Sequence, residues 1–193
     1  MKKLCFILLI STLLLSCSKD VMDRTIFIPD DNDGNLPAYT EWGYNSFGAE
    51  YERSYFLATN SIVPCKILYN NDSLQFTLSG RIKHSKEMTL YFIFPYTQVS
   101  EYADLVQLNN TKIKLNSNTC TVKILQDGIT TTLNILEGEL YFKRTQLLSI
   151  DDITNRVVLS GTFDFRFLFN NMPTYMSNGR FDLGITKNVF YAY

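Results

Sequence analysis

Histidine is almost absent from this chain of 193 residues, which contains only His84, in the stretch Lys83-His84-Ser85-Lys86. A Ser–His–Asp or Cys–His site would depend on this one turn residue, and histidine-rich metal sites are excluded. Positive charge is not in excess, because 18 Lys and Arg residues stand against 19 Asp and Glu residues, so we expect no nucleic-acid partner. No Cys-x-x-Cys pair, glycine-rich phosphate loop or dinucleotide motif occurs. We therefore expect a protein that is not an enzyme, with no catalytic residue, no metal site and no cofactor.

The apolar segment at the N-terminus is short. Leu4 to Leu15 are twelve residues that follow two lysines, whereas a membrane-spanning helix needs about 20 residues. Such a segment is typical of a secretory signal. It ends in Leu14-Leu15-Ser16-Cys17, which resembles the bacterial lipobox. The resemblance implies cleavage before Cys17 and acylation of this cysteine by fatty acids such as palmitate. The alternative is an ordinary signal peptide with a chance cysteine.

Charged residues follow the cysteine directly. Lys19 and Asp20 resemble the export signal of surface lipoproteins of Bacteroidota, although Val21 stands where a second acidic residue is often found. The resemblance implies a protein that is lipid-anchored in the outer membrane and exposed at the cell surface. The periplasmic face of that membrane is the alternative.

Composition divides the chain into three parts. We expect a signal peptide at residues 1–16, lipidated Cys17 with a flexible acidic tether through residue 40, and a single domain at residues 41–193. The tether prediction depends on the polar run Asp30-Asp31-Asn32-Asp33-Gly34. This run does not match a calcium loop, because Pro29 and Thr40 occupy the positions of two essential acidic ligands. Docking of residues 26–28 on the domain as an edge strand is an alternative.

Hydrophobic alternation with a period of two predicts β-strands from Trp42 onward. Phenylalanine at 163, 165, 167 and 169 alternates with Thr162, Asp164, Arg166 and Leu168, and shorter segments around 74–78, 90–94 and 120–125 follow the same rule. Only residues 98–107 favour a short helix. We expect an antiparallel β-sandwich of about nine or ten strands, with a closed lipocalin-like barrel as the alternative.

The last two strands are expected to form a hairpin around residues 170–174. Opposite charges and aromatic side chains stabilise cross-strand pairs by about 0.2–1 kcal/mol each. This rule favours pairing Asp164 with Arg180 and Phe163 with Phe181, and it lays Phe165 over Gly179. A register that pairs Arg166 with Asp182 is the second choice.

Three short motifs carry a resemblance to a known family. Tyr44-Asn45-Ser46-Phe47-Gly48 lies near the start of the domain, and Ser160-Gly161-Thr162-Phe163-Asp164-Phe165 and Asn178-Gly179-Arg180-Phe181-Asp182 lie near its end. Together they resemble a family of uncharacterised lipoproteins of Bacteroidota. The resemblance implies a lipid-anchored β-domain and supplies no activity or catalytic residue.

Two cysteines and one serine are candidates for covalent modification. Cys65 and Cys120 remain in the mature chain, and outside the cytoplasm they are either disulfide-bonded or two buried free thiols. Asp72-Ser73-Leu74 resembles the O-glycosylation acceptor of exported Bacteroidota proteins, which implies a sugar on Ser73.

The leading functional hypothesis is a binding or interaction module held on the outer membrane through Cys17. Its partner would be a glycan or a protein, with Trp42 and tyrosines as a stacking platform. Alternatively these aromatic residues belong to the core and the edges, and replacing Trp42 by alanine then unfolds the domain. Three other functions stay open: a structural envelope-assembly protein, a carrier of lipid or another small molecule if the fold is a barrel, and a small hydrolase that uses Glu137 and Glu139.

Overall fold

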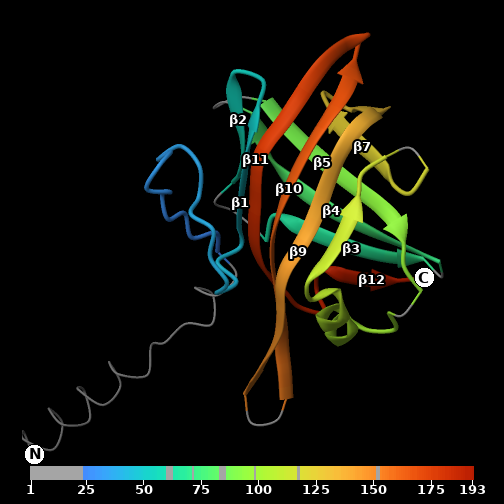
Figure 1. The fold of residues 1–193 in the computed structure, drawn as a ribbon. Coiled ribbons are helices and arrows are strands. Elements are labelled where there is room, and N and C mark those ends of the chain that lie inside the picture. The colour runs from blue at the N-terminus through green and yellow to red at the C-terminus, as the bar shows by residue number, and fades with distance from the viewer. Residues whose placement is uncertain are drawn as a thin grey trace, which may run out of the picture.

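Figure 1 shows a computed structural model of the chain, which describes residues 24–59, 63–70, 72–82, 86–97, 99–116, 118–150 and 153–193. The predictions for residues 1–16, Cys17, Lys19, Asp20 and His84 lie outside this part of the chain. Among the described residues, no helix combines the length and hydrophobicity needed to cross a membrane.

Antiparallel strands make up most of the described residues, so the all-β prediction is confirmed. The expected short helix is present as a single 3-10 helix, η3. The elements in chain order are β1 (Ser46–Tyr51), β2 (Ser54–Ala58), β3 (Cys65–Asn70), β4 (Ser73–Ile82), β5 (Lys86–Pro95), η3 (Tyr102–Leu108), β6 (Thr111–Lys114), β7 (Thr121–Gln126), β8 (Ile129–Thr132), β9 (Asn134–Ile150), β10 (Ile153–Phe169), β11 (Met172–Ile185) and β12 (Phe190–Ala192).

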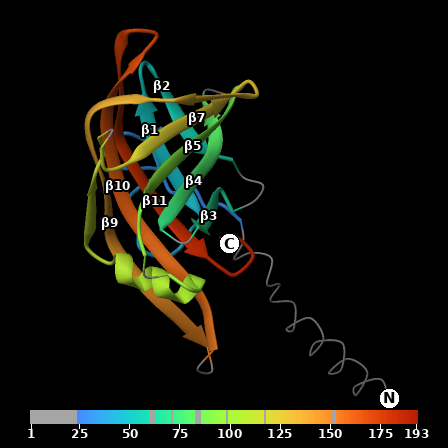
Figure 2. The same ribbon diagram turned by 90° about the vertical axis from the view of Figure 1, so that its right-hand side faces the viewer.

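The strands of the described residues belong to one curled sheet in the order β6-β9-β10-β11-β1-β2-β4-β5-β7-β8. Outside this order, β3 pairs with β4, and β12 pairs with β3 in parallel. The sheet forms a half-barrel whose two halves face each other (Figure 2). Phe76 of β4 packs against Phe142 of β9 and Phe181 of β11, at ring distances of 5.4 and 5.1 Å. Side chains of distant strands therefore meet across the concave face, but the described strands form one curled sheet and neither the two separate sheets of a sandwich nor a closed barrel.

Glycines paired with phenylalanines determine how β10 and β11 meet. Phe163 lies opposite Gly179, and Gly161 lies opposite Phe181. A Cβ atom on Gly179 would come within 2.5 Å of the Phe163 ring, and one on Gly161 within 2.6 Å of the Phe181 ring. Each ring thus covers a glycine of the neighbouring strand, which lets the sheet curve.

The expected register of this hairpin is wrong. Arg180 pairs with Thr162, not with Asp164, and Asp182 pairs with Ser160. The charge pairs expected from the sequence would stabilise the hairpin less than the two contacts between a phenylalanine ring and a glycine stabilise it in the core. The charged residues find other partners, because the segment before β1 lies over them.

Residues 24–40 do not form the free leash that their composition suggests. Leu36 is fully buried, and Pro29 and Pro37 form an isolated β-bridge that closes a loop. Asp30 forms an ion pair with Arg180 at 2.7 Å, and both side chains are largely shielded from solvent. Composition could not predict this docking, since the partner of Asp30 is 150 residues away in the chain. Residues 30–44, which we call the docked loop, are thereby fixed on β11.

Asp182 holds the other end of the docked loop. Its carboxylate is 1% exposed and accepts hydrogen bonds from the backbone N–H groups of Trp42, Gly43 and Tyr44 at 3.1, 2.7 and 3.2 Å. The hydroxyls of Thr40 and Ser160 donate to it at 2.6 and 2.9 Å. A buried carboxylate with this many donors is well compensated for its lost hydration.

The disulfide considered for Cys65 and Cys120 is not formed, and both side chains are buried free thiols. Cys65 on β3 pairs with Leu78 on β4, and Leu78 pairs with Leu90 on β5. Leu90 in turn pairs with Ile124 on β7. Ile124 therefore lies about three strand spacings from Cys65, roughly 14 Å, and Cys120 is four residues before Ile124 in the chain. The Cα atoms of a disulfide lie within about 7 Å of each other.

Candidate binding site

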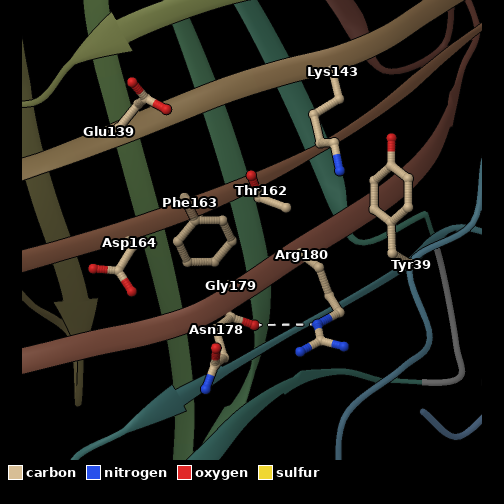
Figure 3. Close-up of a pocket in the computed structure, with 9 residues that line it drawn as sticks. All are labelled: Tyr39, Glu139, Lys143, Thr162, Phe163, Asp164, Asn178, Gly179 and Arg180. Atoms are coloured by element: carbon tan, nitrogen blue, oxygen red, sulfur yellow. Dashed lines mark hydrogen bonds between the residues drawn. The ribbon is translucent and has the colours of Figure 1, made fainter. Parts of the chain in front are cut away.

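Two adjoining hollows lie on the outer face of β9, β10 and β11, beside the docked loop. The first, which we call the Tyr39 hollow, has a volume of about 320 Å³ (Figure 3). The second, the Trp42 hollow, has a volume of about 460 Å³. Tyr39 lines both. The Tyr39 hollow is further lined by Glu139, Lys143, Thr162, Phe163, Asp164, Asn178, Gly179 and Arg180, and the Trp42 hollow by Thr40, Glu41, Trp42 and Gln146.

Strand alternation explains why polar side chains gather here. Phe163 and Phe181 point into the core, so their neighbours Thr162, Asp164 and Arg180 face outward. On β9, Glu139 and Lys143 share this outer face. The strand registers place residues from three distant sequence segments around one depression.

Tyr39 is fixed in place at the junction of the two hollows. Its hydroxyl donates to the carboxylate of Glu41 at 3.0 Å, and Lys143 Nζ lies 4.3 Å from its ring centre. Burial, followed by the hydrogen bond to Glu41, raises the pKa of Tyr39, so the phenol stays protonated at neutral pH. It is a neutral, positioned aromatic group with a polar tip.

Trp42 is the most accessible large aromatic group of the site. The residue is 73% exposed, whereas tryptophan is usually well buried. Its backbone N–H donates to Asp182, and Gln146 of β9 donates to the neighbouring carbonyl of Glu41 at 2.9 Å. The interpretation of Trp42 as a core residue is therefore wrong, and its side chain is presented to solvent by a well-anchored backbone.

Arg180 also lines the Tyr39 hollow. Besides the ion pair with Asp30, its Nε donates to the carbonyl of Asn178 at 3.2 Å (Figure 3). The backbone N–H of Asn32, then that of Asp33 and the charge of Arg180, lower the pKa of Asp30. Asp30 is therefore charged at neutral pH.

The acidic residues of this face do not form an isolated catalytic pair. Glu139 forms an ion pair with Lys112 at 3.0 Å, and Glu137 forms one with Arg166 at 3.1 Å. Partial burial raises the pKa of Asp164, with smaller contributions from Glu137 and Glu50. The arrangement offers hydrogen bonds to a ligand.

The structure places the remaining candidate residues elsewhere. Ser73 is the first residue of β4 and lies far from the hollows in the sheet order, and its predicted glycosylation stays a prediction. Among the residues described, no cluster of three or more His, Cys, Asp or Glu side chains is placed to hold a metal ion.

Comparison of the chain with family models, with curated proteins and with solved structures gives no match. Sequence reasoning had singled out Trp42 but not Tyr39, Lys143 or Arg180. Alternation could have shown that Lys143 and Arg180 face outward. It could not show that a loop predicted to be free lies next to them.

Proposed function

We propose that this protein is a non-catalytic binding module, held on the outer membrane by lipid on Cys17, that binds a saccharide in the Trp42 and Tyr39 hollows. The exposed indole of Trp42 is the observation that carries the proposal. A sugar ring has an apolar face that stacks on an aromatic side chain and hydroxyl groups that need polar partners. Both kinds of surface lie side by side here.

The charge of the hollows supports a neutral, hydroxyl-rich ligand. Lys143 and Arg180 are balanced by Glu139 and Asp164 around the Tyr39 hollow, so the site attracts neither an anion nor a cation strongly. Phosphate-rich ligands prefer a surplus of arginine and lysine. Hydroxyl groups instead use donors and acceptors in equal measure, which this mixed rim supplies.

The alternatives have less support. A lipid carrier needs an apolar cavity, but the concave side of the sheet is filled by phenylalanines whose rings pack edge to face, such as Phe76, Phe92, Phe142, Phe163 and Phe165. A hydrolase based on Glu137 and Glu139 would need one carboxylate free of its ion pair. An envelope-assembly role does not by itself explain an exposed tryptophan above a polar hollow.

The proposal is tested by affinity electrophoresis of the Cys17→Ser chain in gels that contain one soluble polysaccharide each, from a panel of neutral plant, bacterial and mucin glycans. We expect at least one glycan to retard the protein and Trp42→Ala to abolish the retardation. Loss of one aromatic stack of about 1–1.5 kcal/mol weakens affinity roughly five- to thirteenfold.

The matched control is Ile129→Ala, since Ile129 is similarly exposed on β8, outside the residues that line the hollows. Trp42 is the only tryptophan, so its fluorescence should change on binding in the control variant as in the parent chain. No retardation by any glycan, or equal retardation of Trp42→Ala and the parent, would refute the saccharide proposal.

A further inference from the structure

The first described residues lie beside one row of the sheet, that is, a set of residues that pair with one another across neighbouring strands. Arg144, Ser160, Asp182 and Ser46 are successive partners across β9, β10, β11 and β1. Thr25 donates to the carbonyl of Thr59, just beyond the end of β2 where it runs beside the start of β1. The chain therefore enters the domain at the height of this row.

One hairpin extends past this row. β9 continues for six residues from Arg144 to Ile150, and β10 begins with Ile153 paired to Ile150. At about 3.3 Å per residue, the hairpin reaches roughly 20 Å beyond the row. Figures 1 and 2 both show it projecting from the body of the domain. We call residues 144–150 and 153–159 the arm.

The length of chain before the domain limits where a bilayer can lie. Six residues lie between Cys17 and Arg24, and the seven steps from one Cα atom to the next span at most about 25 Å. In the opposite direction, β10 runs nine residues from Ser160 to Phe169, roughly 30 Å. A membrane that holds acyl chains on Cys17 can therefore not lie beyond the hairpin of β10 and β11.

We propose that the arm end of the domain is a lipid-facing surface, with Leu147 and Leu148 in contact with the headgroup region of the membrane. This inference rests on the proposed lipidation of Cys17. Measured from the row, the arm is about 20 Å long, which is nearly the length of about 25 Å that the fully extended tether can span. When the tether reaches less than about 20 Å, a domain that stands with the arm toward the membrane brings the arm into contact with the lipid surface.

Exposed apolar side chains fit this orientation. Leu147 and Leu148 are 45% and 38% exposed on the arm. Ile26, Phe27 and Ile28 are exposed to a similar degree, directly after the point where the chain enters the domain. Apolar groups near the interface stabilise contact with a membrane that a lipid anchor already holds close. Because Arg144 and Gln146 lie on the same arm, we assign the contact to the headgroup region and not to the hydrocarbon core.

The orientation has a consequence for the saccharide site. Gln146, at the base of the arm, lines the Trp42 hollow. The Trp42 hollow would therefore lie close to the lipid surface, next to the residues that contact it. The exposed Met172, at the opposite hairpin, would point away from the membrane.

The test uses the full chain, acylated in a Gram-negative host and reconstituted into phosphatidylcholine–phosphatidylglycerol vesicles. Single nitroxide labels are placed at Leu148→Cys and, as a matched control, at Met172→Cys. The native Cys65 and Cys120 thiols are buried and do not compete for the label. Collision with a water-soluble nickel chelate and with oxygen reports whether each label lies in water or in the lipid interface.

We expect the label at residue 148 to lose nickel accessibility and gain oxygen accessibility on vesicles, relative to the soluble Cys17→Ser chain. The label at residue 172 should not change. Mass spectrometry of Cys17 distinguishes a failure of the lipid-anchor proposal from a failure of the lipid-contact inference. An unacylated cysteine overturns both the lipid anchor and this inference, whereas an acylated protein whose residue 148 stays as accessible as residue 172 overturns this inference alone.

Discussion

Replacing Asp182 by alanine is expected to cost more stability than any surface change in this protein. The substitution removes the common acceptor of three backbone N–H groups and two hydroxyls. Leaving one buried donor unsatisfied costs about 1–3 kcal/mol. Water can reach some of these donors once the docked loop loosens, so we expect a loss of about 3–5 kcal/mol in the free energy of unfolding.

Urea denaturation followed by far-UV circular dichroism measures this loss. Glu87→Ala is the matched control, because Glu87 is an exposed carboxylate on β5, 3.3 Å from Arg81. Exposed ion pairs contribute about 0–1 kcal/mol. A difference between the two variants of less than about 1 kcal/mol would show that Asp182 does not hold the loop.

Hydrogen exchange gives an independent measure of the same contact. The amides of Trp42, Gly43 and Tyr44 should be protected in the parent chain and exchange much faster in Asp182→Asn. That variant retains only one acceptor oxygen and places an NH₂ group among donors. Unchanged protection of these three amides would refute the reasoning, whatever the change in global stability.

Three further predictions concern the core and the helix. Gly161→Ala should destabilise the fold by about 2 kcal/mol or more in urea titrations, because its Cβ would meet the Phe181 ring and the Tyr141 carbonyl, whereas Gly34→Ala, with open space around it, should not. Burial raises the pKa of the Cys65 thiol, and it raises the pKa of the Cys120 thiol to about 11. Neither thiol should therefore react with Ellman's reagent at pH 8 until the protein is unfolded. Rapid reaction of the native protein would contradict the buried placement. Hydrogen bonds from the backbone N–H groups of Ser100 and Glu101 lower the pKa of Asp104 in the folded protein. The stabilisation of η3 by Asp104 is therefore complete above the pKa of Asp104 in the unfolded chain, near 4, and is lost as the pH falls through the lower pKa of the folded protein. Acid titration of Asp104→Asn should show a smaller loss of stability than that of the parent chain.

Local patterns in the sequence predicted the fold class because each strand carries its own signal. The phenylalanines at 163, 165 and 167 alternate with polar residues, and all three are buried in the structure. The same patterns could not predict that the strands join into one curled sheet. That outcome depends on contacts between distant segments, such as Gly48 with Leu57 and Arg180 in neighbouring strands.

The register error has a definite physical origin. The register expected from the sequence depends on cross-strand charge pairs, and it includes Gly179 only as a residue that a phenylalanine ring covers. In the structure the glycines decide the register, because both Gly161 and Gly179 lie where a Cβ would collide with a phenylalanine ring. Surface charges contribute little and accept other partners. A glycine that alternates in phase with buried phenylalanines is the signal that would have found the register.

The family-like motifs have a structural role that differs from the proposed binding role. Ser46, Phe47 and Gly48 of the first motif pair with Asp182, Phe181 and Arg180 of the last. Arg180 and Asp182 both face outward on β11, two residues apart, and they bind the docked loop at Asp30 and at residues 40–44. The motif residues thus fix the backbone that presents Tyr39 and Trp42. It follows that Trp42 can change with little effect on folding and a large effect on binding, whereas Asp182 affects both.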